Sequence, residues 1–282
     1  MRSAWLLIAV VVMASGAAAR EVTLLAKENL TAWCIVPFDA AKRGPEERAQ
    51  MLDRLGIKRL AYDWRARHIP TFDAEVIAMK RHGIEIVAWW LSKNPAENQK
   101  IFEVIERHGI HPQLWISIDD PPAGSQEAMV AAASATLRPL AVEAQRLGCK
   151  LALYNHGGWF GEPQNQVAII KQLAMDNVGI VYNFHHGQGH IGHFPELFPL
   201  LKPHLLALNL NGMTLEPGGA GEKIMDIGSG DREFGMLREV IDSGWSGPVG
   251  ILDHRDKEDS EVVLTRNLKG LAALAERLRT EP

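Results

Sequence analysis

The 282-residue chain lacks several features that would narrow its class. It has no cluster of lysine and arginine, and its net charge at pH 7 is −4, so nucleic acid is a poor candidate partner. It has only two cysteines, Cys34 and Cys149. A chain of this length can build its core without disulfides, so we expect two buried thiols. Beyond its first residues, no apolar run reaches the roughly 18 residues that a membrane span needs.

The N-terminus differs in composition from the rest of the chain. Arg2 is followed by an uncharged apolar run from Ala4 to Ala14, and then by the small residues Ala17-Ala18-Ala19. This pattern predicts a secretory signal peptide over residues 1–19, which would leave a mature domain of residues 20–282. An uncleaved anchor helix is the alternative. We therefore expect a periplasmic or secreted protein that has no membrane contact after cleavage.

Short apolar runs recur about every thirty residues, and they are apolar on both alternations, as strands buried on both faces are. The predicted strands are Ala32–Pro37, Arg59–Trp64, Glu85–Leu91, Gln113–Ile118, Lys150–Asn155, Val178–Phe184, Leu205–Leu210 and Pro248–Asp253. Helical patterns lie between and after them. The predicted helices begin at Pro45 and Thr71 and then cover Ala96–His108, Gln126–Leu147, Asn165–Met175, Phe194–Leu201, Asp231–Ser243 and Ser260–Arg279.

Eight strands that alternate with eight helices predict the α/β fold class, as a single (β/α)8 TIM barrel. An open, doubly wound sheet is the competing fold, and it would carry a glycine-rich turn after its first strand. The segment that follows the first strand here, residues 38–44, has no such fingerprint. We therefore expect no nucleotide cofactor.

In barrels of this kind the functional residues sit at the carboxyl ends of the strands. Seven of the predicted strands, the second to the eighth, carry His, Asn, Asp or Trp at or just after those ends, whereas the opposite ends carry no such cluster. The histidines could serve as a general base, since an unperturbed imidazole has a pKa of roughly 6.5. We predict His156, His186, Lys93 and Asp120 as catalytic candidates.

A second group of strand-end residues suits the recognition of a small-molecule carbohydrate. Amides complement sugar hydroxyls, and an indole can lie against a sugar ring. One of the neighbours Trp89 and Trp90 must face the helices. The predicted substrate-binding residues are Trp90, Asn155, Trp159, Asn183, His185, Asn209, Asn211 and His254. Structural roles are the alternative for each of these residues, because Asp can cap a helix and a lone His is more often structural.

The chain also resembles the xylose isomerase-like barrels, the sugar phosphate isomerases and epimerases. The most specific stretch runs from Ile227-Gly228-Ser229-Gly230-Asp231 to Gly244-Trp245-Ser246-Gly247-Pro248. It resembles the family's Gly-x-Gly loop, its seventh helix and its entry into the eighth strand. Tyr154-Asn155-His156 and Asn183-Phe184-His185-His186 resemble segments of the fifth and sixth strands.

The resemblance implies proton transfer next to a sugar carbonyl, with one divalent metal held by Glu, Asp, His and Glu from strands five to eight. Here Tyr154 or a neighbour, Asn183, Asn209, and Leu252 or Asp253 stand at those positions. Amides are weaker ligands than carboxylates for a hard cation. His156, His186 and Asp253, with or without Asp120, could form a reduced site, so a divalent metal stays open as a cofactor.

The sequence thus predicts an exported isomerase, epimerase or lyase that abstracts a proton α to the carbonyl of a sugar or keto-glycoside. Two alternatives remain. A glycoside hydrolase would need two carboxyl groups across the site, from Asp119 or Asp120 and from Asp253. A non-catalytic sugar-binding protein would have kept the pocket after losing the metal site. The sequence does not indicate the oligomeric state.

Overall fold

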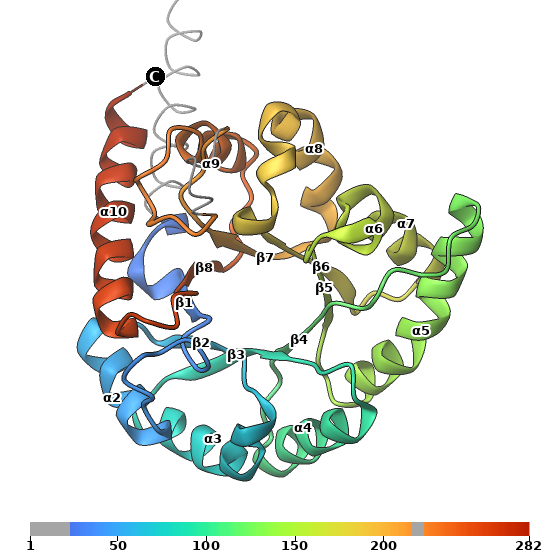
Figure 1. The fold of residues 1–282 in the computed structure, drawn as a ribbon, viewed down its shortest axis with the longest axis horizontal. Coiled ribbons are helices and arrows are strands. Elements are labelled where there is room, and N and C mark those ends of the chain that lie inside the picture. Colours follow the sequence, from blue (N-terminus) through green and yellow to red (C-terminus); the bar gives the residue numbers. More distant parts are fainter. Residues whose placement is uncertain (1–22, 216–222, 282) are drawn as a thin grey trace, which may run out of the picture.

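The computed structural model describes residues 23–215 and 223–281, so the predicted signal segment 1–19 lies outside the described residues. Eight parallel strands close into a barrel in sequence order, with β1 paired to β8 (Figure 1). The strands are β1 (Leu30–Trp33), β2 (Arg59–Tyr62), β3 (Glu85–Trp90), β4 (Gln113–Ile116), β5 (Leu151–Tyr154), β6 (Val178–Asn183), β7 (Leu205–Leu210) and β8 (Val249–Leu252). The (β/α)8 prediction is confirmed.

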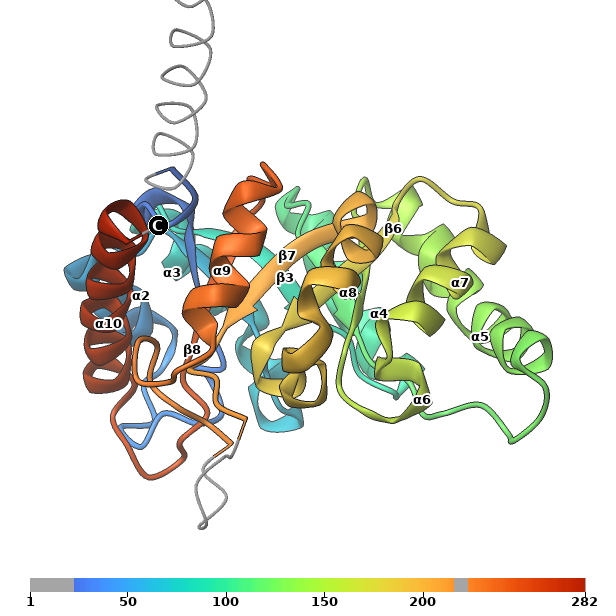
Figure 2. The same ribbon diagram turned by 90° about the horizontal axis from the view of Figure 1, so that it is seen from above.

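Helices surround the barrel, as both views show (Figures 1 and 2). The α-helices are α2 (Pro45–Leu55), α3 (Phe72–Arg81), α4 (Pro95–His108), α5 (Gln126–Arg146), α6 (Gly158–Gly161), α7 (Pro163–Leu173), α8 (Phe194–Leu201), α9 (Glu233–Asp242) and α10 (Ser260–Thr280). Five short 3-10 turns join them at Lys27–Asn29, Ala66–Thr71, Phe184–His186, Gln188–His193 and Lys202–His204. The eight predicted helices are all present.

Local sequence explains where the helices begin and end. The Asn94 and Ser125 side chains accept backbone N–H bonds at the starts of α4 and α5. Gly56 and Gly109 adopt left-handed φ values of 70° and 56° immediately after α2 and α4. Glycine takes this conformation without strain, so it ends a helix cleanly and turns the chain toward the next strand.

The core has two parts. The larger lies between the strands and the helices, where Trp89 packs with Tyr62 and Phe72. The smaller fills the barrel interior with a few large rings opposite small side chains, a pairing that packs an interior closely. It consists of Trp33, Cys34, Ala61, Ala88, Trp115, Ala152, Tyr154, Val181, Ala207 and Leu252, with Trp90 packed against it.

Two smaller predictions are also confirmed. Of the two adjacent tryptophans, Trp89 faces the helices and Trp90 the barrel interior. Cys34 and Cys149 are both buried and unpaired. Among the described residues, no helix is long and apolar enough to cross a membrane.

Two glycines inside helices provide a test of the packing around α10. A Cβ added at Gly270 would lie 1.7 Å from the backbone oxygen of Ile227, whereas one added at Gly235 in α9 would meet nothing within 4 Å. We expect Gly270→Ala to destabilise the fold by about 1–3 kcal/mol, despite the better helix propensity of alanine. Gly235→Ala should stabilise it by about 0.5–1 kcal/mol. Urea unfolding of both variants checks this, and equal effects would contradict the close contact.

Candidate active site at the barrel mouth

Four histidine rings meet beyond the carboxyl ends of β5, β6 and β8. The ring centroids of His156 and His186 lie 4.5 Å apart, and those of His186 and His185 are also 4.5 Å apart. His254 continues the group at 5.6 Å from His185, and it packs against Phe38. The structure therefore brings together all four histidines that the sequence singled out. We call them the histidine cluster.

An aromatic wall lines one side of the cluster. Trp90 lies 6.4 Å from His156 and 5.1 Å from Tyr154, and the Tyr154 ring is 5.8 Å from His186, measured between centroids. A cavity of about 410 Å³ opens beside this wall. It is lined by Trp64, Arg65, Ala66, Trp90, Leu91, Ser92, Lys93, Glu97, Ser117 and His156. Aromatic and polar groups at this size are typical of a small-molecule site.

The electrostatics keep the histidine cluster neutral. Burial lowers the pKa of His186 to about 2 and that of His185 to about 4. The pKa of His156 is lowered first by burial and then by the positive charges of Lys223 and Lys93. The pKa of His254 is lowered by burial and by Arg65. Neutral imidazoles can accept protons, so the cluster is in its basic form at neutral pH.

A polar layer lies beneath the cluster. The Tyr154 hydroxyl accepts an N–H from the Trp33 indole at 3.0 Å and another from the Asn183 amide. Asn209 is fully buried in this layer, where its amide lies beside the Tyr154 hydroxyl.

Asn155 and Asn211 lie near the barrel mouth, but the amides of both side chains are hydrogen-bonded to backbone groups. Asn155 accepts the N–H of Asn183 at 2.7 Å and donates to its carbonyl at 3.1 Å, which extends the pairing of β5 and β6. Asn211 bonds the carbonyls of Gly212 and Lys223 and the N–H of Met225, so it holds the loop after β7. Substrate contact by these two amides stays a prediction.

Three further candidates lie on the rim toward α5. The carboxylate of Asp120 accepts the N–H groups of Trp159 and Phe160 at 2.9 and 2.8 Å, which caps α6. The Trp159 indole donates to Gln126 of α5, so this ring is engaged away from the cluster. Lys93 is exposed and forms an ion pair with Asp119. The structure thus gives Asp120 a capping position, and a catalytic role for it stays a prediction.

The predicted metal set of His156, His186 and Asp253 is not assembled. Asp253 is fully buried, and its carboxylate accepts the hydroxyl of Ser260, the first residue of α10, at 2.7 Å and the Arg255 N–H at 2.9 Å. In residues 23–215 and 223–281 no group of three or more His, Cys, Asp and Glu could hold a metal ion. The described residues therefore do not assemble this ligand set, because the Asp253 carboxylate is bonded to Ser260 and Arg255, and a divalent metal at the site stays a prediction.

The positions that the resemblance assigns to the metal do not fit one either. Tyr154, Asn183 and Asn209 offer neutral hydroxyl and amide groups, and the first two are already bonded to each other. Divalent cations prefer carboxylates or free imidazoles. The residues at these positions therefore do not form a divalent-metal site.

Sequence reasoning missed two residues near the site. Asp63, at the end of β2, is buried, and burial raises its pKa to about 7. Its position at the carboxyl end of a predicted strand could have marked Asp63 as a candidate site residue. Lys223 acts electrostatically on His156, His185 and His186. It lies in the long loop after β7, where no pattern in the sequence marks it.

Comparison with known proteins supports the fold. No family model matches the chain, and no curated protein matches its sequence. Solved structures do match. The 3-keto-D-glucoside 4-epimerase from E. coli is 14% identical with a TM-score of 0.62, and the match covers 88% of this chain and 99% of that one.

Two other solved structures are similar. The IOLI protein with a bound zinc atom is 13% identical with a TM-score of 0.67, over 88% of this chain and 98% of that one. A xylose isomerase domain protein from Planctomyces limnophilus is 15% identical with a TM-score of 0.62, over 82% and 92%. The chain has the fold of the xylose isomerase-like TIM barrels. At these identities the likeness establishes the fold alone.

Proposed function

We propose that this chain is a carbohydrate-active enzyme of isomerase or epimerase type, which moves a proton next to the carbonyl of a sugar or keto-glycoside. The observation that carries the proposal is the neutral imidazole pair His156–His186, 4.5 Å apart against the wall of Trp90 and Tyr154. The same fold in a 3-keto-D-glucoside 4-epimerase supports the reaction class.

The chemistry needs a base and a stabilised oxyanion. One imidazole removes the proton α to the carbonyl, the C–H electron pair forms a C=C bond, and the C=O π pair moves to the oxygen to give an enediolate. An ammonium group, Lys223 or Lys93, offsets the new negative charge. Return of the proton to the other carbon isomerises the sugar, whereas return to the opposite face epimerises it. Loss of a β-substituent instead would be the lyase outcome.

A non-catalytic sugar-binding protein is the second candidate. The scarcity of free carboxylates favours it, since Asp120 caps α6, Asp253 bonds the Ser260 hydroxyl and Asp119 forms an ion pair with Lys93. The same observation weakens the hydrolase alternative, which needs two poised carboxyl groups.

Export remains part of the proposal. The apolar run and small residues of segment 1–19 support a periplasmic or secreted location, in which sugar phosphates are scarce. We therefore favour an unphosphorylated carbohydrate as substrate.

Solvent-deuterium exchange tests the proposed reaction. Purified protein in D2O is incubated with a panel of keto-sugars and 3-keto-glycosides, and loss of the α-proton signal is followed by NMR. We expect exchange in at least one substrate class, followed by isomer, epimer or eliminated product. Binding without exchange across the panel would favour the sugar-binding protein.

The pH dependence tests the role of Lys223. A general base works when deprotonated, and the pKa of His156 is lowered, so kcat/KM should stay high below pH 6.5 and fall only at more acidic pH. Lys223→Gln removes a positive charge and should move this acid limb upward by a few tenths of a pH unit, while lowering kcat. Lys150→Gln, at the opposite end of β5, is the control. An unchanged limb in Lys223→Gln would contradict the assignment.

A further inference from the structure

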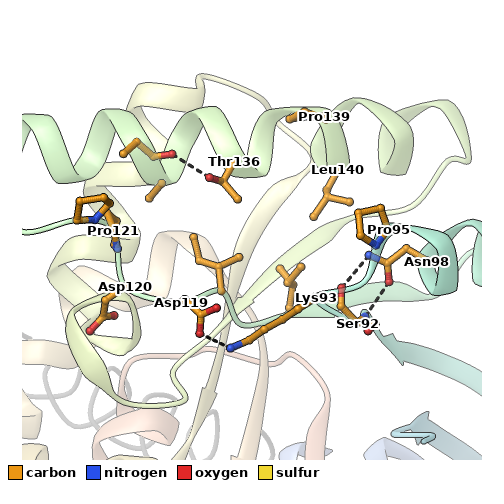
Figure 3. A pocket seen from close by; sticks show the side chains of 15 residues that line it. Ser92, Lys93, Pro95, Asn98, Asp119, Asp120, Pro121, Thr136, Pro139 and Leu140 are labelled. Carbon is orange, nitrogen blue, oxygen red and sulfur yellow. Dashed lines mark hydrogen bonds and ion pairs between the residues drawn. The ribbon is translucent and has the colours of Figure 1, made fainter. Parts of the chain in front are cut away.

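Helices α4 and α5 leave a groove between them. α5 packs against α7, and α4 packs against α3, whereas α4 and α5 pack less closely and are joined by the ion pair of Glu106 with Arg146. The space between them, over β4, is a cavity of about 530 Å³ (Figure 3). Ile116 of β4 lines the floor of this cavity and is itself buried, whereas Ile118, just after the strand, is half-buried.

The lining of this groove is mostly apolar. Ile116 and Ile118 come from β4 and the residues after it, and the wall formed by α5 carries Ala132, Ala133, Thr136, Pro139 and Leu140. The polar groups here already have partners. Asn98 bonds the backbone of Ser92 at 2.7 and 2.8 Å, and the Thr136 hydroxyl donates to the Ala132 carbonyl at 3.1 Å (Figure 3). The groove therefore suits an apolar group rather than a second sugar.

The groove adjoins the cavity at the barrel mouth. Ser92 and Lys93 line both spaces, and the ion pair of Lys93 with Asp119 lies where they meet. Figure 3 shows Lys93 extended toward Asp119 along the edge of the groove. A ligand that contacts His156 and Trp90 can therefore continue past Lys93 onto the apolar surface over β4. One molecule with a polar part and an apolar part would fill both spaces.

We propose that the substrate is a glycoside with an apolar aglycone, whose sugar lies at the histidine cluster and whose aglycone lies in the α4–α5 groove. This inference rests on the proposed function for the position of the sugar. The continuity of the two spaces at Ser92 and Lys93 is what points to an aglycone rather than to a separate apolar ligand. Free sugars would then be poorer ligands than their alkyl or aryl glycosides.

Binding of alkyl glycosides to the full chain tests this directly. The probes are methyl, butyl and hexyl β-D-glucosides and β-D-galactosides, measured by calorimetry below their aggregation concentrations. We expect Kd to fall about threefold to fourfold for each of the first added methylenes, as apolar burial predicts. Ala132→Trp should fill the groove and remove this dependence, with methyl glycoside binding unchanged.

Ala135→Trp is the matched control, because Ala135 is exposed on the same helix and does not line the groove. It should keep the wild-type dependence on chain length. The proposal would be overturned if the wild-type Kd did not depend on alkyl chain length, or if Kd fell with chain length equally in Ala132→Trp. Deuterium exchange separates the two proposals. If α-proton exchange occurs but Kd does not depend on alkyl chain length, the aglycone groove alone is rejected. If Kd falls steeply with chain length but no exchange occurs, the enzyme proposal is rejected and the groove proposal is retained.

Discussion

Replacing His186 by alanine is expected to slow α-proton exchange by about 100-fold, the lower end of a general base's contribution, because burial lowers the pKa of His186 to about 2 and weakens it as a base. Sugar affinity should change little, since Trp90 and Tyr154 remain in place. The imidazole of His186 is half-buried and neutral, and it lies between His156 and His185. Exchange rates and Kd values, measured with the same substrate, separate lost chemistry from lost binding.

His156→Ala identifies which imidazole is the base. If His156 is the base, its loss should produce the larger fall in rate, and His186 would then act through its contact with His156. His193→Ala is the control, because His193 is exposed and belongs to the 3-10 turn Gln188–His193 outside the cluster. Wild-type exchange in both His156→Ala and His186→Ala would disprove the proposed site.

Asp63→Asn is expected to alter stability strongly and with a defined pH dependence. Burial raises the pKa of Asp63 to about 7 in the folded chain, against about 3.9 when unfolded. The folded state therefore holds a proton that the unfolded state loses, so stability falls as pH rises from about 4 to about 7. The full difference is about 4 kcal/mol. Asparagine does not titrate, so the Asp63→Asn variant should not lose this stability as the pH rises.

Urea unfolding at pH 5 and pH 8 checks this expectation. The wild type should be less stable at pH 8 than Asp63→Asn, and the two should be closer at pH 5. Asp242→Asn, at an exposed carboxylate at the end of α9, is the control and should follow the wild type. A gap between wild type and Asp63→Asn that does not grow with pH would show that Asp63 is not buried as a neutral acid.

The fold was predictable because its signals are local. Strands buried on both faces and helices with an apolar stripe can be recognised without their neighbours, and all eight units were found. The predicted and observed elements differ in the bounds of β1 and in the short helix α6. β1 begins at Leu30 and stops at Trp33, because Cys34 has a left-handed φ of 59° that no strand accommodates. Helix α6 was missed, since its start depends on the positive φ values of Gly157 and Gly158.

The candidate site was predictable only in part. Strand-end positions correctly placed the four histidines together, because the carboxyl ends of parallel strands share one rim. Hydrogen-bond partners, however, come from tertiary structure. Nothing in the sequence shows that Asp253 reaches Ser260, or that the amide of Asn155 pairs with the backbone of β6. For the same reason the predicted metal set could not be judged before the fold was known.

The most direct test of the account is deuterium exchange by protein that has been freed of divalent metal with a chelator and checked by elemental analysis. Proton transfer is proposed on the His156–His186 pair, and the described residues form no group of three or more metal ligands. We therefore expect the metal-free wild type to exchange the α-proton at an undiminished rate and His186→Ala to exchange it more slowly. Exchange that disappears with the metal and returns with added Zn2+ or Mn2+ would contradict it.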